Sequence, residues 1–360
     1  MILLFVLLFS PLSFSLSFDC AVPHPTLGYS FKPGCEGKGE FYNSSHYAFR
    51  INKMGLRAKD FGKKTKYRIM VVGDSLTVDY GENGAVVSFE KELRARFPQG
   101  SFEVVNASVP GYSVMQMYLF LPKLLKEYQP DAVIYNSNFA SRALLDQQSV
   151  SCGSTLNEKG LVTKIVPCTL VWPLSPDLGW RVFSWFSPEH RHKVRGFAEG
   201  LHVLVDGLKL GLRILLQGRE QATTEIFTIR RGHLRAIQEM VKATSADFFL
   251  LNFIDKARGE KNYQPREKQF SWYQAETFLY FLPFQIVSEE QWMAYKRFLR
   301  EEFPGLIDLA WMERPKDSTS AHGVAYNPSS KNAIGRQLAV EMIPFLEKRF
   351  GQKAKNASEK

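Results

Sequence analysis

The sequence contains few cysteines and lacks two common cofactor motifs. Four cysteines occur among 360 residues, and no two of them form a Cys-x-x-Cys pair. That spacing argues against a zinc site built from thiolates. The Gly-x-x-x-x-Gly-Lys-Ser/Thr pattern that cradles phosphates is also missing, and Gly73–Thr77 does not fit it. We therefore expect no metal ion and no nucleotide cofactor.

The first 17 residues lack any charged side chain. Residues 1–17 are mostly Leu, Phe and Ser, and they end in small residues at Ser15 and Ser17. This stretch is short for a membrane span, and its pattern favours a secretory signal cut near Ser17. Because a basic start is also missing, an uncleaved membrane anchor is the alternative. The chain is thus expected to be secreted or to lie in the periplasm or cell envelope.

The four cysteines fall into two pairs that are close in sequence. An even number of cysteines in an exported chain favours disulfide bonds. We predict the bonds Cys20–Cys35 and Cys152–Cys168. Four free, buried thiols are the alternative.

The charge balance is strongly basic, with a net charge of +10. Such a surface attracts acidic polymers, anionic lipid headgroups or nucleic acid. The basic residues are dispersed, without the regular alternation with aromatic residues that is typical of single-strand binders. In an exported chain this pattern predicts an anionic envelope surface as partner, and no nucleic acid.

The hydrophobic pattern predicts alternating strands and helices. Strands are expected at 67–72, 102–106 and 131–135, with helices over 83–97 and 114–128 between them. This alternation is typical of a doubly wound parallel sheet. Further elements follow, with strands at 246–252 and 306–309 and helices at 200–217, 224–243, 288–301 and 332–348. We predict a three-layer α/β fold around a mainly parallel, five-stranded sheet.

Composition divides the chain into segments. After the leader at 1–17, residues 18–66 are rich in Gly, Pro and Ser, and we expect an irregular lead-in packed on the core. The main domain spans 67–350. Residues 147–200 interrupt the alternation of strands and helices and contain several prolines and tryptophans, which suggests an inserted cap. The charged end, 351–360, is expected to be a flexible tail.

The residues that indicate catalysis lie at the junction between the first predicted strand and the loop that follows it. Gly73-Asp74-Ser75-Leu76 follows the apolar run 67–72, so the Ser75 hydroxyl is expected at the C-terminal edge of the sheet, where open α/β folds place their sites. A helix starting nearby offers backbone N–H groups that can hold a developing oxyanion. The junction therefore predicts an esterase or acyl-transfer site.

Three blocks in this order resemble the SGNH/GDSL hydrolase family, which is named for Ser, Gly, Asn and His. Gly73–Leu76 matches the first block and Asn106–Ser113 the second. Asn136–Phe139 matches the third in part, without the Gly and Asp of the family's Gly-x-Asn-Asp. Upstream, Asn52–Arg57 resembles the Asn-x-x-Gly-x-Arg lead-in of bacterial members. The resemblance implies a flavodoxin-like fold, with Ser75 as nucleophile.

The resemblance also implies which groups stabilise the reaction. The oxyanion hole would consist of the Ser75 N–H, the Gly111 N–H and the side-chain amide of Asn138. A glycine at position 111 allows close approach of the backbone, because it has no Cβ. No cofactor is implied.

The general base is the least regular part of the pattern. Seven histidines occur, and His322 alone lies in the loop before the last helix, where the family keeps its histidine. Thr319 stands where the family has aspartate, so Asp317 is the candidate that orients the imidazole. An alignment on 327–330 instead puts Asn327 in the histidine position, which would make the protein a non-catalytic relative. We predict His322 as the base.

Together these features predict a secreted or envelope serine esterase or deacylase. An acetylated carbohydrate or a lipid ester is the implied substrate, and an acyl-enzyme the implied intermediate. An O-acyltransferase would use the same residues, with a sugar hydroxyl in place of water. A non-catalytic protein that binds glycan or another envelope component is the third possibility.

Overall fold

A parallel five-stranded sheet forms the centre of the molecule. The computed structural model describes residues 20–40, 46–74, 77–79, 83–97, 102–110, 112–136, 154–165, 218–252, 288–309 and 328–358. Its sheet consists of β5 (Tyr67–Val72), β6 (Phe102–Asn106), β7 (Ala132–Asn136), β10 (Asp247–Asn252) and β11 (Leu306–Asp308). Their order is β11-β10-β7-β5-β6, and every pairing is parallel. This is the flavodoxin-like order, so the predicted doubly wound fold is confirmed.

The central strands are apolar on both faces because helices cover both faces. All six residues of β5 are buried, and so are all five of β7. Side chains alternate along β5: Ile69 and Val71 belong to one hydrophobic cluster, whereas Met70 and Val72 belong to the other. The sheet therefore separates two cores.

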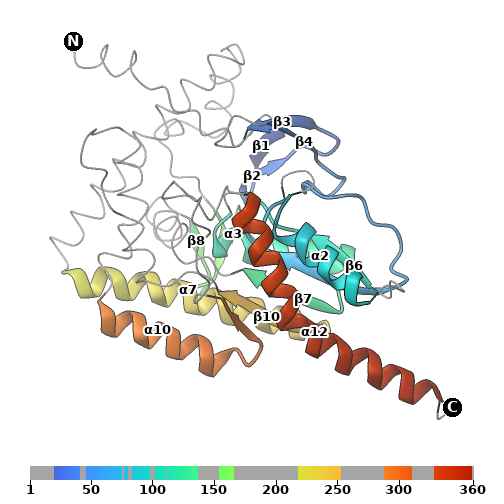
Figure 1. Ribbon diagram of the computed structural model, residues 1–360. Helices are drawn as coiled ribbons and strands as arrows, with labels where there is room; N and C mark the ends of the chain where they lie inside the picture. The colour runs from blue at the N-terminus through green and yellow to red at the C-terminus, as the bar shows by residue number, and fades with distance from the viewer. Residues whose placement is uncertain are drawn as a thin grey trace, which may run out of the picture.

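One face is covered by α2 (Ala85–Arg96) and α12 (Pro328–Ser358), which lie side by side (Figure 1). Their backbones approach closely at Gly335. A Cβ atom added there would lie 2.1 Å from the Ala85 carbonyl oxygen and 2.9 Å from the Phe89 nitrogen. Only glycine fits at this contact.

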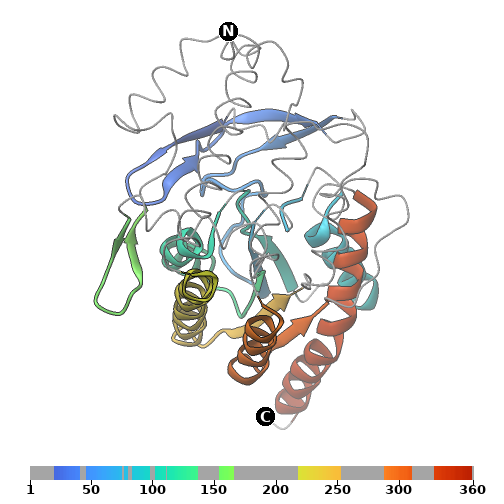
Figure 2. The ribbon, with the colours of Figure 1, turned by 90° about the vertical axis from the view of Figure 1, so that its left-hand side faces the viewer.

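The other face is covered by α3 (Val114–Tyr128), α7 (Arg219–Lys242) and α10 (Glu289–Glu302), which Figure 2 shows nearly end-on. Large side chains fill the space between α7 and α10, and the rings of Phe227 and Tyr295 lie 5.0 Å apart. Both α3 and α10 begin with a capping box, which satisfies backbone donors at the helix start. The layer of α2 and α12 thus packs through a close backbone contact, whereas large side chains fill the contact between α7 and α10.

Several boundaries agree with the sequence pattern. The bounds of β5, β6 and α3 are those predicted, but α12 begins four residues earlier than expected and continues to Ser358. The expected flexible tail from residue 351 is therefore helical up to that point. Residues 352–355 are Gln, Lys, Ala and Lys, all good helix formers.

The N-terminal segment differs from the expected irregular lead-in. Two antiparallel hairpins form within it, β1 (Ala21–His24) with β2 (Gly28–Phe31) and β3 (Glu36–Glu40) with β4 (His46–Arg50). These strands contain proline, glycine or charged residues in place of an apolar run, and Glu36–Glu40 has no large apolar side chain, so the pattern did not predict them. The predicted Cys20–Cys35 disulfide is confirmed.

Of the predicted cap at 147–200, the structure describes residues 154–165. They form a small hairpin, β8 (Thr155–Leu156) with β9 (Val162–Lys164). The Ile165 N–H donates to the Thr26 carbonyl at 2.8 Å, which joins this hairpin to the β1–β2 turn. The rest of the cap, the Cys152–Cys168 bond, the helix at 200–217 and the leader lie outside the described residues. No helix in the described part of the chain is long and apolar enough to cross a membrane.

Candidate active site

The C-terminal ends of β6, β5 and β7 meet at one edge of the sheet. The helix after β5 packs on one face and the helix after β6 packs on the other. The edge between β5 and β7 is therefore the switch point of the doubly wound fold, where such folds bind ligands. The three sequence blocks follow these three strands.

The predicted Ser75, Gly111, Asn138, Asp317 and His322 all lie outside the described residues, so their roles stay predictions. Residues within two positions of Ser75, Gly111 and Asn138 in the sequence are described, and these residues contact one another. The Asn136 amide Nδ2 donates to Asp74 Oδ1 at 3.3 Å. The Val109 N–H donates to the Gly73 carbonyl at 2.9 Å. The structure thus brings residues of the three blocks into contact.

Gly73 allows β5 and β7 to end close together. A Cβ atom at this position would lie 2.5 Å from Thr77 Oγ1 and 2.8 Å from Asn136 Cβ. Both separations are too short for real atoms, so a side chain here would displace the turn that leads to Ser75.

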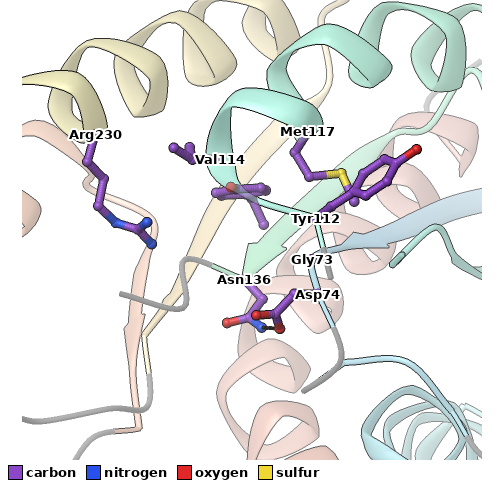
Figure 3. A pocket seen from close by; sticks show the side chains of 8 residues that line it. Gly73, Asp74, Tyr112, Val114, Met117, Asn136 and Arg230 are labelled. Carbon is purple, nitrogen blue, oxygen red and sulfur yellow. Dashed lines mark hydrogen bonds between the residues drawn. The ribbon is translucent and has the colours of Figure 1, made fainter. Parts of the chain in front are cut away.

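A cavity opens beside this contact. It is small and partly open to solvent, and it is lined by Gly73, Asp74, Tyr112, Val114, Met117, Tyr135, Asn136 and Arg230. In Figure 3 the Asp74 and Asn136 side chains lie side by side, while Met117 and Arg230 come from the helices across the cavity. The Asn136 side chain is 3% exposed, and its Oδ1 accepts no hydrogen bond from any described residue. An unsatisfied buried acceptor of this kind is costly unless a ligand or water donates to it.

Buried polar side chains hold the loop that follows β5. Asn106 Nδ2, at the end of β6, donates to the Thr77 carbonyl at 2.9 Å and to Asp79 Oδ2 at 2.7 Å. Ser108 Oγ donates to Thr77 Oγ1 at 2.8 Å. The described loop residues on the C-terminal side of Ser75 are therefore fixed to the neighbouring strand.

Asp79 connects this loop to α2. Its Oδ1 accepts hydrogen bonds from the Val86 and Val87 N–H groups at 3.0 and 3.2 Å, so the carboxylate caps the helix. Burial raises the pKa of Asp79 to about 6, although the bonds from Asn106 and the backbone oppose the shift.

Lys331 connects the same loop to α12. This lysine lies in the first turn of the helix, is fully buried, and donates from Nζ to the Val78 carbonyl at 2.7 Å. Burial lowers the pKa of Lys331 to about 7, while the charges of Asp79 and Asp74 act in the opposite direction. The loop that carries Ser75 is therefore anchored to both helices of one layer.

Arg230 brings a positive charge to the cavity from the other layer. It lies on α7, is 1% exposed, and donates from Nε to the Tyr295 hydroxyl at 3.1 Å. The cavity therefore combines a carboxylate, an amide and a guanidinium with apolar walls.

Two histidines in the described residues have structural roles. His24 Nδ1 accepts from the Thr26 and Leu27 N–H groups. His233 is fully buried, and its Nε2 accepts from the Val162 N–H at 3.0 Å, so its Nδ1 carries the proton and donates to the Ile229 carbonyl. Burial lowers the pKa of both imidazoles.

Sequence reasoning missed Lys331 and Arg230, although a signal exists for both. Lys331 continues the buried stripe of Ile334 and Leu338, at spacings of three and seven. Arg230 lies three residues after the buried Phe227 and four before the buried Leu234. A charged residue within the apolar stripe of an amphipathic helix indicates a buried charge.

No protein-family model matches the sequence, and no curated protein matches it. Solved structures similar to the chain include the psychrotrophic esterase EstA from Pseudoalteromonas sp., at 15% identity and a TM-score of 0.38, over 78% of this chain and 100% of that one. A lipase from a goat rumen metagenome is 13% identical with a TM-score of 0.36, over 77% and 97%. A catalytic mutant of the acetylxylan esterase Axe2 from Geobacillus stearothermophilus is 11% identical with a TM-score of 0.34, over 76% and 95%.

Proposed function

We propose that this protein is a serine hydrolase of the SGNH/GDSL type that cleaves ester bonds, with Ser75 as nucleophile. The observation that carries the proposal is the contact between Asp74 and Asn136 beside a cavity at the switch point. These residues belong to two of the three blocks that resemble the family. A ligand in the cavity would therefore lie next to the residues that the sequence singles out.

The proposed reaction proceeds through an acyl-enzyme. The base, His322, takes the Ser75 proton as the hydroxyl oxygen attacks the ester carbonyl, and Asp317 orients the imidazole. The N–H groups of Ser75 and Gly111 and the amide of Asn138 stabilise the negative oxygen of the tetrahedral intermediate. The imidazolium then returns its proton to the departing alkoxide. Water repeats the sequence on the acyl-enzyme and releases the acid.

The anchoring of α12 supports a role for His322. The first turn of this helix is tied to the loop that follows β5 through Lys331 and Val78. His322 lies six residues before Pro328, the first residue of the helix. Six residues can span at most about 20 Å, so His322 lies within that distance of a helix start that is tied to this loop.

The cavity favours a small acyl group. Val114, Met117 and Tyr135 supply apolar surface, which suits an acetyl or another short chain. We therefore propose an acetylated carbohydrate or a short-chain lipid ester as substrate. The Cys20–Cys35 bond fits an oxidising compartment, which supports export, and the net charge of +10 supports contact with an anionic envelope surface.

The first test removes the nucleophile. Ser75→Ala should lower the turnover of p-nitrophenyl acetate by at least about 10³-fold, and a serine-directed phosphonate should label the native protein at Ser75. Ser288→Ala is the matched control: it removes the cap of α10, far along the chain, and costs about 1 kcal/mol of stability without loss of turnover. Unchanged turnover in Ser75→Ala, or a folded native protein that the phosphonate does not label, would contradict the proposal.

A second test identifies the base and the acceptor. His322→Ala should abolish turnover while Asn327→Ala retains it, and the reverse result would reassign the position. Time-resolved product analysis with an added sugar acceptor separates hydrolysis from acyl transfer. Acetylated sugar as the main product would identify an O-acyltransferase.

A further inference from the structure

The hairpin β1–β2 contacts the loop that follows β6 on both sides of Gly111. The Tyr29 hydroxyl donates to the Pro110 carbonyl at 2.6 Å. In return, the Tyr112 hydroxyl donates to the Tyr29 carbonyl at 2.8 Å. The two rings meet edge to face, with centroids 5.2 Å apart. The residues before and after Gly111 are therefore both tied to Tyr29.

Hydrogen bonds fix both ends of the segment from Val109 to Tyr112. The Tyr112 N–H donates to the Val109 carbonyl at 3.2 Å, and the Val109 N–H donates to the Gly73 carbonyl at the end of β5. Proline is second and glycine third in this segment, an order that type II turns favour and type I turns allow. These two types share the same ends and differ by a rotation of the central peptide group. A glycine in third place permits both, so the turn alone does not fix that peptide.

The central peptide joins Pro110 to Gly111, and its N–H is the proposed oxyanion donor. A peptide group is planar and trans, so its C=O and N–H point in opposite directions. A hydrogen bond that holds the Pro110 carbonyl toward Tyr29 thus also sets the direction of the N–H. It polarises the peptide as well, which strengthens the N–H as a donor.

We propose that Tyr29 is a positioning residue that selects one orientation of the Pro110–Gly111 peptide and so directs its N–H to the oxyanion of the ester reaction. This inference rests on the proposed function. It assigns a role to the N-terminal hairpin, which lies outside the blocks that resemble the family.

The hairpin is well placed to hold a hydroxyl group in a fixed position. The Cys20–Cys35 bond closes it. Gln116 Nε2, in the first turn of α3, donates to the Leu27 carbonyl at 2.8 Å within the core. The disulfide thus closes the hairpin, and the start of β2 is attached to α3, so the Tyr29 ring has little freedom to move.

The kinetic test compares two tyrosines that form the same contact. Tyr29→Phe should lower kcat for p-nitrophenyl acetate by about 10- to 100-fold with little change in KM, because loss of one oxyanion donor costs about 10²- to 10³-fold. Tyr112→Phe also loosens the hairpin, but it leaves the Pro110 carbonyl bonded, so its kcat should fall at least about fivefold less. Equal losses of kcat in the two variants would overturn the proposal.

A second readout does not depend on turnover. In protein labelled with ¹⁵N-glycine, the Gly111 amide resonance, assigned through Gly111→Ala, should shift in Tyr29→Phe and stay near its place in Tyr112→Phe. An unchanged Gly111 resonance in Tyr29→Phe would overturn the proposal even if kcat falls. If Ser75→Ala keeps full turnover, the proposed function fails, while this amide measurement still decides whether Tyr29 sets the peptide.

Discussion

The two helical layers of the protein each bring one buried cation toward the same sheet edge, but in different surroundings. Lys331 on α12 bonds a loop carbonyl and faces the charges of Asp79 and Asp74. Arg230 on α7 bonds the Tyr295 hydroxyl and lines the cavity. The first cation holds the loop that leads to and from Ser75, whereas the second shapes the space that a ligand would occupy.

The layers also differ in how closely their helices approach. The α2 and α12 backbones nearly touch at Gly335, whereas aromatic side chains lie between α7 and α10. A close backbone contact leaves no room for adjustment, but large side chains can repack. Substitutions in the α2/α12 layer should therefore affect stability more than similar ones in the other layer.

The largest effect is expected for Lys331→Met. Removing this cation leaves the Asp79 carboxylate buried without its opposite charge, which typically costs about 3–5 kcal/mol. Unfolding in urea at pH 7 measures the loss. Lys348→Met, an exposed position on the same helix, should stay within about 0.5 kcal/mol of the native protein. If Lys331→Met and Lys348→Met lower the free energy of unfolding by the same amount, the charges of Lys331 and Asp79 do not anchor the loop.

Gly335→Ala should have the next largest effect. Its Cβ would meet the Ala85 carbonyl oxygen at 2.1 Å, so α12 must move away from α2. Overpacking of this kind costs about 1–3 kcal/mol, which thermal unfolding would detect. A melting temperature equal to that of the native protein would show that the two helices are less tightly packed than the structure indicates.

The buried side chains of Asp79 and Lys331 also predict that the free energy of unfolding depends on pH. The pKa of Asp79 is raised to about 6, so the folded state holds its proton longer and stability falls as pH rises from about 4 to 6. The pKa of Lys331 is lowered to about 7, so stability rises again above pH 7 as the folded state releases this proton first. Each proton contributes a slope of up to about 1.4 kcal/mol per pH unit.

Urea unfolding between pH 4 and 10 tests this dependence. Lys331→Met should lack the rise above pH 7. Its fall in stability should also extend to higher pH, because Asp79 loses a cation that lowers its pKa. A variant that keeps the rise above pH 7 would exclude Lys331 as its source.

The smallest effect, of opposite sign, is expected for Gly232→Ala on α7. A Cβ atom there meets one heavy atom within 4 Å, Leu161 Cδ2 at 4.0 Å, so it fits without strain. Alanine stabilises a helix interior by about 0.5–1 kcal/mol over glycine. A small rise in melting temperature, compared with the fall in Gly335→Ala, would confirm that the two layers differ in packing. A fall in melting temperature in both Gly232→Ala and Gly335→Ala would contradict this difference in packing between the two layers.

The regular core was predictable because its elements carry strong periods. The strand at 67–72 and the helix at 114–128 have clear apolar patterns, and their bounds agree with the structure. The hairpins at Ala21–Phe31 and Glu36–Arg50 were not predicted, since their strands contain proline, glycine or charged residues in place of an apolar run. The extension of α12 was missed because high charge suggested fraying, although those residues favour helix.

The sequence predicted the order of the three blocks of the candidate site along the chain, but not the contacts between them. The blocks at residues 73–76, 106–113 and 136–139 each follow a strand, which any parallel sheet brings to one edge. The pairing of Asp74 with Asn136 joins residues 62 positions apart. The strand order sets that pairing, and the strand order depends on how the helices cover the two faces.

By itself, the sequence determined the alternation of strands and helices, the local disulfide at Cys20–Cys35 and the position of a serine after the first core strand. Apolar periodicity and close spacing act over a few residues, so they can be read along the chain. Only the tertiary structure decided that Lys331 meets Val78 and that Tyr29 meets Pro110. These contacts join residues 253 and 81 positions apart, and their geometry depends on the packing of whole helices and hairpins.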